Sequence, residues 1–159
     1  MNISKELLSL AGEYAVASEL CRMGMYAQLT FGHQKKTDIL VLNPENNKMI
    51  TIEVKSKQQS DFPNCQGIKG KNAFLVLVDF KNKKPEDMPD FYILSEKDWL
   101  DFVNAEIEKH PDKDIRIENN CPVWYGQVKN GRPYKGMGIK PKQVKENRDK
   151  WDLITKAIE

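Results

Sequence analysis

The chain has 159 residues, 40% of them hydrophobic and 30% charged, which predicts one globular domain over residues 1–159 with a real core. The formal net charge of +2 is too small to indicate nucleic-acid binding by itself. Three widely spaced cysteines without a CxxC pair argue against a disulfide framework and a structural zinc site.

The first residues, MNISKELLSL, lack the long apolar stretch of a signal peptide, and no run of residues approaches membrane-spanning length. These features predict a cytoplasmic protein with no membrane partner. The charge is uneven along the chain, because residues 1–119 contain 16 Lys and Arg against 19 Asp and Glu, whereas residues 120–159 contain 9 against 4. The last quarter is therefore either a basic surface or a solvated helix face with a lysine-rich loop.

The chain begins with a predicted amphipathic helix from Ser4 to Met23, which Gly24 ends. Its expected core face, with Cys21 inside the core, follows helical spacing through Leu7, Leu10, Ala11, Tyr14, Ser18 and Cys21. Five strands are expected over 25–31, 37–43, 48–57, 73–80 and 90–94, with a polar loop over 58–72. A helix capped by Ser95 and Asp98, a hairpin around Asn130-Gly131 within 123–137, and a final helix over 140–159 complete the chain.

Two acidic groups and an amine interrupt the strand pair 37–43 and 48–57. Asp38 opens the first apolar run, while Glu53 and Lys55 lie two residues apart in the second. A period of two puts Glu53 and Lys55 on one face of the sheet, where ionised side chains are costly unless they are paired or bound to a metal. Two carboxylates on adjacent strands can hold Mg²⁺, and an ammonium beside them can orient a water molecule or stabilise a phosphate oxygen.

The order of these features resembles the PD-(D/E)xK nuclease superfamily, which includes restriction endonucleases and Holliday-junction resolvases. The segments TDILVL and ITIEVKSK match its strand acid and its (D/E)-x-K motif, although Thr37 stands where the family name has Pro. The helix AGEYAVASELCRMG is similar to the helix that carries a glutamate in the family, here Glu13. The resemblance covers about residues 4–105 and implies an α/β fold with a restriction endonuclease-like three-layer core, a mixed β-sheet flanked by helices.

The resemblance also implies a function and a set of site residues. The chain would be a metal-dependent nuclease that hydrolyses phosphodiester bonds of nucleic acid, with DNA favoured. Asp38, Glu53 and the Val54 backbone carbonyl would hold Mg²⁺ or Mn²⁺. Lys55 would position or activate the attacking water, and Glu13 would help to bind the metal or orient the water. Cleavage of the restriction type would need a homodimer or contacts from loops.

Two other functions stay open. A nuclease fold without catalysis could bind nucleic acid or a protein partner. A small-molecule enzyme or an interaction protein would instead carry Asp38, Glu53 and Lys55 as exposed residues that lie far apart.

Several residues support secondary hypotheses. His33 could be a base, although a lone loop histidine is more often a surface residue, and Gln58 could contact phosphate. Lys35 and Lys36 either bind a DNA backbone or serve solubility. Near the predicted hairpin, three aromatic residues are interleaved with three cations: Trp124, Tyr125 and Tyr134 with Lys129, Arg132 and Lys135. The aromatic residues either stack on bases or complete a core, and we favour the core.

Overall fold

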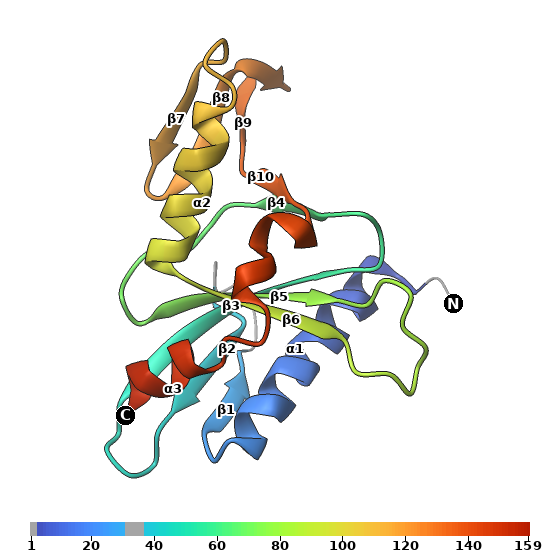
Figure 1. Ribbon diagram of the computed structural model, residues 1–159, viewed down its shortest axis with the longest axis vertical. Coiled ribbons are helices and arrows are strands. Elements are labelled where there is room, and N and C mark those ends of the chain that lie inside the picture. Colours follow the sequence, from blue (N-terminus) through green and yellow to red (C-terminus); the bar gives the residue numbers. More distant parts are fainter. Residues whose placement is uncertain (1–2, 31–36) are drawn as a thin grey trace.

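The computed structural model describes residues 3–30 and 37–159, and a five-stranded β-sheet lies at its centre (Figure 1). The strand order is β1-β2-β3-β5-β6. The sheet is mixed, because β3 and β5 are parallel while the other neighbouring pairs are antiparallel. Its strands are β1 (Tyr26–Leu29), β2 (Ile39–Leu42), β3 (Met49–Lys57), β5 (Ala73–Asp79) and β6 (Asp90–Ser95).

Helices cover both faces of this sheet. On one face, α1 (Lys5–Arg22) and α3 (Asp152–Ile158) pack against the side chains of Ile52 and Val76. On the other face, α2 (Glu96–Glu108) and the 3₁₀ helix η1 (Pro141–Asn147) share a second apolar core with Leu75 and Leu77. The predicted α/β class, a mixed sheet flanked by helices, is confirmed. Among the helices of residues 3–30 and 37–159, none is long and apolar enough to cross a membrane.

The predicted core face of α1 is wrong. Leu7 and Tyr14 are 59% and 60% exposed, and Cys21 is also exposed. The helix instead buries a narrower set of residues against the sheet: Gly12, Val16, Ala17 and Leu20. Small side chains let the helix approach β3 closely, because a Cβ atom added at Gly12 would lie only 1.8 Å from the Ser56 Oγ. The buried face of α1 is therefore decided by how closely the helix can approach the sheet, which a count of large apolar residues does not measure.

The segment 58–72, predicted as loop, contains the short strand β4 (Phe62–Cys65). This strand pairs in antiparallel fashion with β10 (Met137–Ile139), so that Cys65 lies opposite Met137. Four residues that include Pro63 are too few to show an alternating pattern, and the partner strand lies about seventy residues further along the chain. The strand therefore depends on a tertiary contact.

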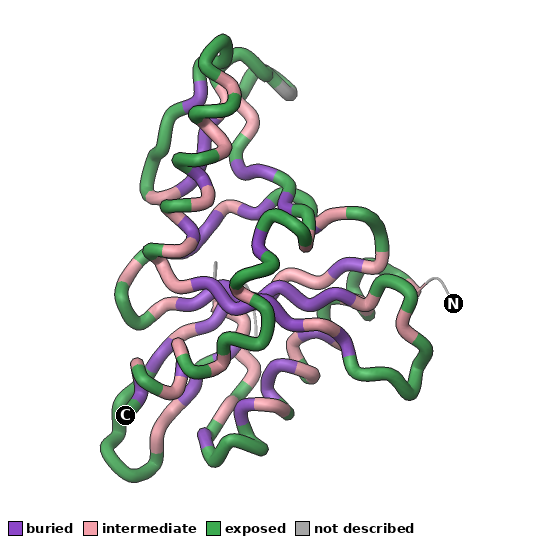
Figure 2. Tube along the Cα trace, in the orientation of Figure 1, coloured by how far each residue is buried: buried purple, intermediate pink, exposed green. Residues whose placement is uncertain are grey.

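The predicted hairpin around Asn130-Gly131 is confirmed and gains a third strand. The sheet has the order β7 (Ile115–Glu118), β8 (Cys121–Lys129) and β9 (Arg132–Lys135). The φ angles of Asn130 and Gly131 are 52° and 73°, as the tight turn of a two-residue hairpin requires. This sheet projects from the central sheet together with α2 (Figure 1), and Figure 2 shows that much of its surface is exposed.

The capping box of Ser95 and Asp98 at the start of α2 is confirmed, but the single final helix over 140–159 is wrong. The chain forms η1, leaves the helical conformation at Arg148, and starts again as α3. At the break, Asp149 has a φ of 53° and its N–H donates to the Phe91 carbonyl at 3.0 Å, while Arg148 forms a β-bridge with Tyr92. Pairing with β6 therefore replaces about one turn of helix.

Candidate active site

The pairing of β2 with β3 brings Asp38 beside Glu53. Ile39, the first residue of β2, lies opposite Ile52, and the Asp38 N–H donates to the Ile52 carbonyl at 2.8 Å. The Asp38 Oδ2 accepts a hydrogen bond of 2.6 Å from the Val54 N–H. Because β2 begins at the next residue, the Asp38 carboxylate lies where the strand pair opens and is held against the backbone of β3.

Glu53 and Lys55 lie on one face of β3, as their spacing predicts. The Lys55 Nζ lies 3.0 Å from the Glu53 Oε1. Glu53 is only 5% exposed, and its other carboxylate oxygen, Oε2, is buried without a hydrogen-bond partner in the described part of the chain. An unpartnered buried polar atom costs about 1–3 kcal/mol, and more when it carries charge, so this oxygen is suited to accept a ligand.

Lys55 is held in its charged form by its neighbours. Burial lowers the pKa of Lys55, but the charge and hydrogen bond of Glu53, with a further contribution from Asp38, outweigh that effect and raise the pKa. An ammonium at this position can donate hydrogen bonds to a phosphate oxygen or a water molecule. A charged amine at this position is suited to positioning a water molecule or a phosphate oxygen.

Glu13 approaches the same site from α1. Burial raises the pKa of the Glu13 carboxyl, the negative charge of Asp38 raises it further, and Ser9 and Lys55 oppose the shift. The Ser9 Oγ donates to the Glu13 Oε1 at 3.4 Å, one turn earlier on the helix. Glu13 thus lies within electrostatic range of both Asp38 and Lys55, although it belongs to an element on the opposite side of the sheet.

The donor set fits a hard divalent cation in an open site. In residues 3–30 and 37–159, no group of three or more His, Cys, Asp and Glu side chains is arranged to enclose a metal ion. Mg²⁺ often uses only one or two protein carboxylates and completes its shell with water and substrate phosphate oxygens. Asp38 and Glu53 could supply these carboxylates and Val54 its backbone carbonyl, with the unpartnered Glu53 Oε2 as the clearest vacant donor.

A pocket of about 210 Å³ exposes Val54 and Lys55 to solvent. Lys55 lies in its wall, between the N-terminal half of α1 and the strand β4. The lining residues are Lys5, Leu8, Ser9, Val54, Lys55, Ser56, Pro63 and Asn64. Cys65 lies close by, but burial raises the pKa of its thiol to about 12 against the opposing charge of Lys55, so a thiolate has no part in this site at neutral pH.

The structure bears on only some of the secondary hypotheses. His33, Lys35 and Lys36 lie outside the described residues. Gln58 lines a separate pocket of about 240 Å³ with Phe80 and Lys83, away from Lys55.

The aromatic residues near the hairpin mostly make structural contacts. The Trp124 Nε1 donates to the Gly136 carbonyl at 2.8 Å, and Trp124 packs against the second core. The exposed Tyr125 donates its hydroxyl to Glu118 and stacks under the Arg116 guanidinium, whose central carbon lies 4.4 Å from the ring centroid. Trp124 therefore completes a core, as we favoured, and Tyr125 already has partners within its own sheet.

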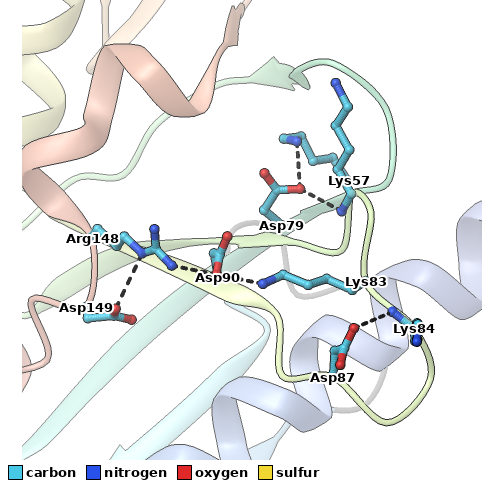
Figure 3. Close-up of polar contacts among 9 residues, drawn as sticks. Lys57, Asp79, Lys83, Lys84, Asp87, Asp90, Arg148 and Asp149 are labelled. Carbon is cyan, nitrogen blue, oxygen red and sulfur yellow. Dashed lines mark hydrogen bonds and ion pairs between the residues drawn. The ribbon is translucent and has the colours of Figure 1, made fainter.

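Sequence reasoning missed a buried ion pair at the end of β3. The Lys57 Nζ lies 2.7 Å from the Asp79 Oδ1, and both side chains are almost fully buried (Figure 3). The pair joins β3 to β5, because Lys57 lies opposite Asp79 in the parallel register. Asp79 ends an apolar strand just as Asp38 begins one, and that signal could have identified it.

Asp90 lies at the centre of a second group of polar contacts at the same end of the sheet. It accepts from Lys83 at 2.9 Å and from Arg148 at 2.8 Å (Figure 3). Arg148 also lies 3.6 Å from the Asp149 carboxylate. These contacts fix the start of β6 to the segment between η1 and α3.

No protein-family model and no curated protein matches this chain. Among solved structures, the chain is similar to a bacterial homing endonuclease, I-Ssp6803I, with a TM-score of 0.50 and 15% sequence identity. The similarity covers 96% of this chain and 93% of that one. At this identity the likeness shows only that the two chains share a fold over nearly their whole length.

The site geometry bears on the open alternatives. Asp38, Glu53 and Lys55 are neither separated nor all exposed, because Glu53 is buried, pairs with Lys55 and lies beside Asp38. A small-molecule enzyme or an interaction protein was expected to carry these three residues exposed and far apart. The observed arrangement contradicts that expectation.

Proposed function

We propose that this protein is a divalent-metal-dependent nuclease of the PD-(D/E)xK superfamily that hydrolyses phosphodiester bonds, with DNA as its substrate. The observation that carries the proposal is the buried Glu53 carboxylate, with one oxygen on Lys55 and the other without a partner. A buried carboxylate oxygen without a partner is costly, and a divalent cation bound between Glu53 and Asp38 would offset that cost. The endonuclease fold supports the same function.

Each residue has a distinct role in this proposal. Asp38, Glu53 and the Val54 carbonyl hold Mg²⁺ or Mn²⁺, which when bound lowers the pKa of a water molecule and offsets the negative charge of the phosphate. The Val54 N–H keeps the Asp38 carboxylate in place. Lys55 donates hydrogen bonds that orient the attacking water in line with the leaving oxygen. Glu13 orients the water or adds an outer ligand through its position near Asp38.

The direct test is cleavage of plasmid, linear and branched DNA, and of RNA, with Mg²⁺, with Mn²⁺ and with EDTA. The Asp38→Ala and Lys55→Ala variants should lose metal-dependent cleavage. The matched controls are Lys97→Ala and Asp101→Ala, which remove an exposed ion pair on α2 and should cleave as the unmodified protein does. Folding of each variant is checked by circular dichroism, and Mn²⁺ binding by calorimetry.

The outcomes separate the nuclease from its alternative. Cleavage that requires the metal and both site residues supports the proposal. Absence of cleavage on every substrate, together with no heat of Mn²⁺ binding, overturns it. Nucleic-acid binding without any cleavage would favour the catalytically silent nuclease fold.

A further inference from the structure

A second, larger concave surface lies next to the candidate active site. It has a volume of about 570 Å³ and is formed by β9 and the segment around β4. Its lining residues are Asn64, Gln66, Asn130, Arg132, Pro133, Tyr134 and Lys135, which we call the β9 groove. The lining contains two cations and three side-chain amides but no carboxylate, so it presents donors and positive charge to a ligand.

The β9 groove and the pocket that exposes Lys55 share one lining residue. Asn64 lines both spaces and so lies at their junction. Close packing at Gly136 holds the two sides together, because a Cβ atom there would lie 2.8 Å from the Cys65 carbonyl oxygen. The pairing of β10 with β4 adds a strand contact next to this point. A long ligand could therefore occupy both spaces at once, with one part at Lys55 and another at Arg132.

The local charge indicates a polyanion. Residues 121–145 contain six Lys and Arg and no Asp or Glu, whereas the chain as a whole has a net charge of only +2. On the other side of the groove, the lining residues Asn64 and Gln66 are uncharged, and the nearest acid in that segment is Asp61. Arg132 and Lys135, which lie in the acid-free stretch 121–145 of the sequence, are both exposed. Concentrated charge of one sign attracts a ligand of the opposite sign and speeds its association.

The shape of this region favours duplex DNA over other polyanions. Beyond Trp124, where β7 no longer pairs with β8, the strands β8 and β9 form a two-stranded ribbon that ends in the tight Asn130-Gly131 turn (Figure 1). The major groove of B-form DNA admits a two-stranded β-ribbon. The major groove of duplex RNA is too deep and narrow for side chains to read.

We propose that the β9 groove anchors the backbone of a DNA duplex whose scissile phosphate lies at Lys55. Arg132 and Lys135 bind phosphates, and Asn64 and Gln66 donate hydrogen bonds to phosphate or sugar oxygens beside the cleavage site. These residues position the substrate and take no part in bond breaking. This inference rests on the proposed nuclease function, but its test does not depend on catalysis.

The experiment measures binding of a fluorescent DNA duplex of about 30 base pairs in EDTA over a range of salt concentrations. The test variant is Arg132→Ala/Lys135→Ala. The matched control, Lys150→Ala/Lys156→Ala, removes the same charge beside and within α3, at the other end of the molecule (Figure 1). Losing two phosphate contacts should reduce the slope of log K against log salt by about 1.8 and weaken binding about 30-fold near 0.15 M salt.

The control variant should bind DNA as the unmodified protein does. If the test variant matches the control in slope and affinity, the β9 groove is not an anchor and the proposal is wrong. Tighter binding of duplex RNA or single-stranded DNA than of duplex DNA by the unmodified protein would also overturn it. Binding that depends on Arg132 and Lys135 while no cleavage occurs with any metal would refute the nuclease function and leave the groove assignment standing. An Arg132→Gln/Lys135→Gln variant repeats the measurement if the alanine variant does not fold.

Discussion

The Asp79→Ala substitution should destabilise the protein strongly, because it leaves the buried Lys57 ammonium without its counter-ion. The Lys57 and Asp79 side chains are 2% and 10% exposed and their charged atoms lie 2.7 Å apart. The Lys57 Nζ also donates to the Gln59 carbonyl at 3.0 Å and lies 5.2 Å from the centroid of the Phe62 ring. Those two contacts remain in the variant, but neither one neutralises the charge.

The expected magnitude follows from the geometry. At 2.7 Å and an effective dielectric constant of about 20, the attraction within the pair is about 6 kcal/mol, and desolvation of both ions offsets much of it. Removing one partner of such a pair costs about 3–5 kcal/mol. For a domain of this size each kcal/mol lowers Tm by about 2–4 °C, so Asp79→Ala should lower Tm by about 6–20 °C.

Urea unfolding and thermal scans of Asp79→Ala, Asp79→Asn and Lys57→Met/Asp79→Leu measure this effect. Asp79→Asn keeps an acceptor for the Lys81 N–H, which now donates to the Asp79 Oδ1 at 2.8 Å, and should lose less stability than Asp79→Ala. The double variant replaces both charges by apolar groups and should be more stable than Asp79→Ala, since no buried charge is left alone. A loss below about 1 kcal/mol for Asp79→Ala, or a double variant less stable than the single one, would refute the reasoning.

Three further results are expected. Glu53→Gln should reduce metal-dependent cleavage by at least about 100-fold and abolish the heat of Mn²⁺ binding, and cleavage at the unmodified rate would remove Glu53 from the site. Gly12→Ala should lower the free energy of unfolding, measured in urea, by about 1–3 kcal/mol because the new Cβ meets the Ser56 Oγ. Adding Ser56→Ala should restore part of the lost stability. A single variant that is unchanged or more stable would contradict the close packing of α1 on β3. Ser95→Ala should cost about 1 kcal/mol in the same assay by removing the α2 cap, and no loss at all would contradict that role.

Local patterns predicted much of the fold. The strand pair around Asp38 and Glu53, the buried strand β5, the capping box at Ser95 and the Asn130-Gly131 turn all follow from periods of two, apolar runs and specific turn residues. Each of these signals operates within a few residues, and the tertiary contacts in this fold agree with it. The E-x-K spacing belongs to the same group, because the strand period alone puts Glu53 and Lys55 on one face.

Other features depended on contacts between distant segments. The buried face of α1 followed from the close approach that Gly12 permits, and the exposed Leu7 and Tyr14 show that apolar spacing alone was misleading. Strand β4 needed β10 as its partner, and the final helix was broken at Asp149 by a bond to Phe91. A local sequence pattern does not show which distant segment will pack against it. The buried face of α1, the strand β4 and the break in the final helix could therefore not be predicted from one segment.

By itself, the amino-acid sequence determined which chemical groups the candidate site could use: two carboxylates, a backbone carbonyl and an amine on neighbouring strands. Only the tertiary structure shows that Glu53 is buried with one oxygen unpartnered in the described residues, that Glu13 on α1 lies within electrostatic range of Asp38, and that Asn64 lines both the Lys55 pocket and the β9 groove. The physical reason is that strand periodicity acts over neighbouring residues, whereas burial, electrostatic proximity and surface continuity depend on how whole elements pack.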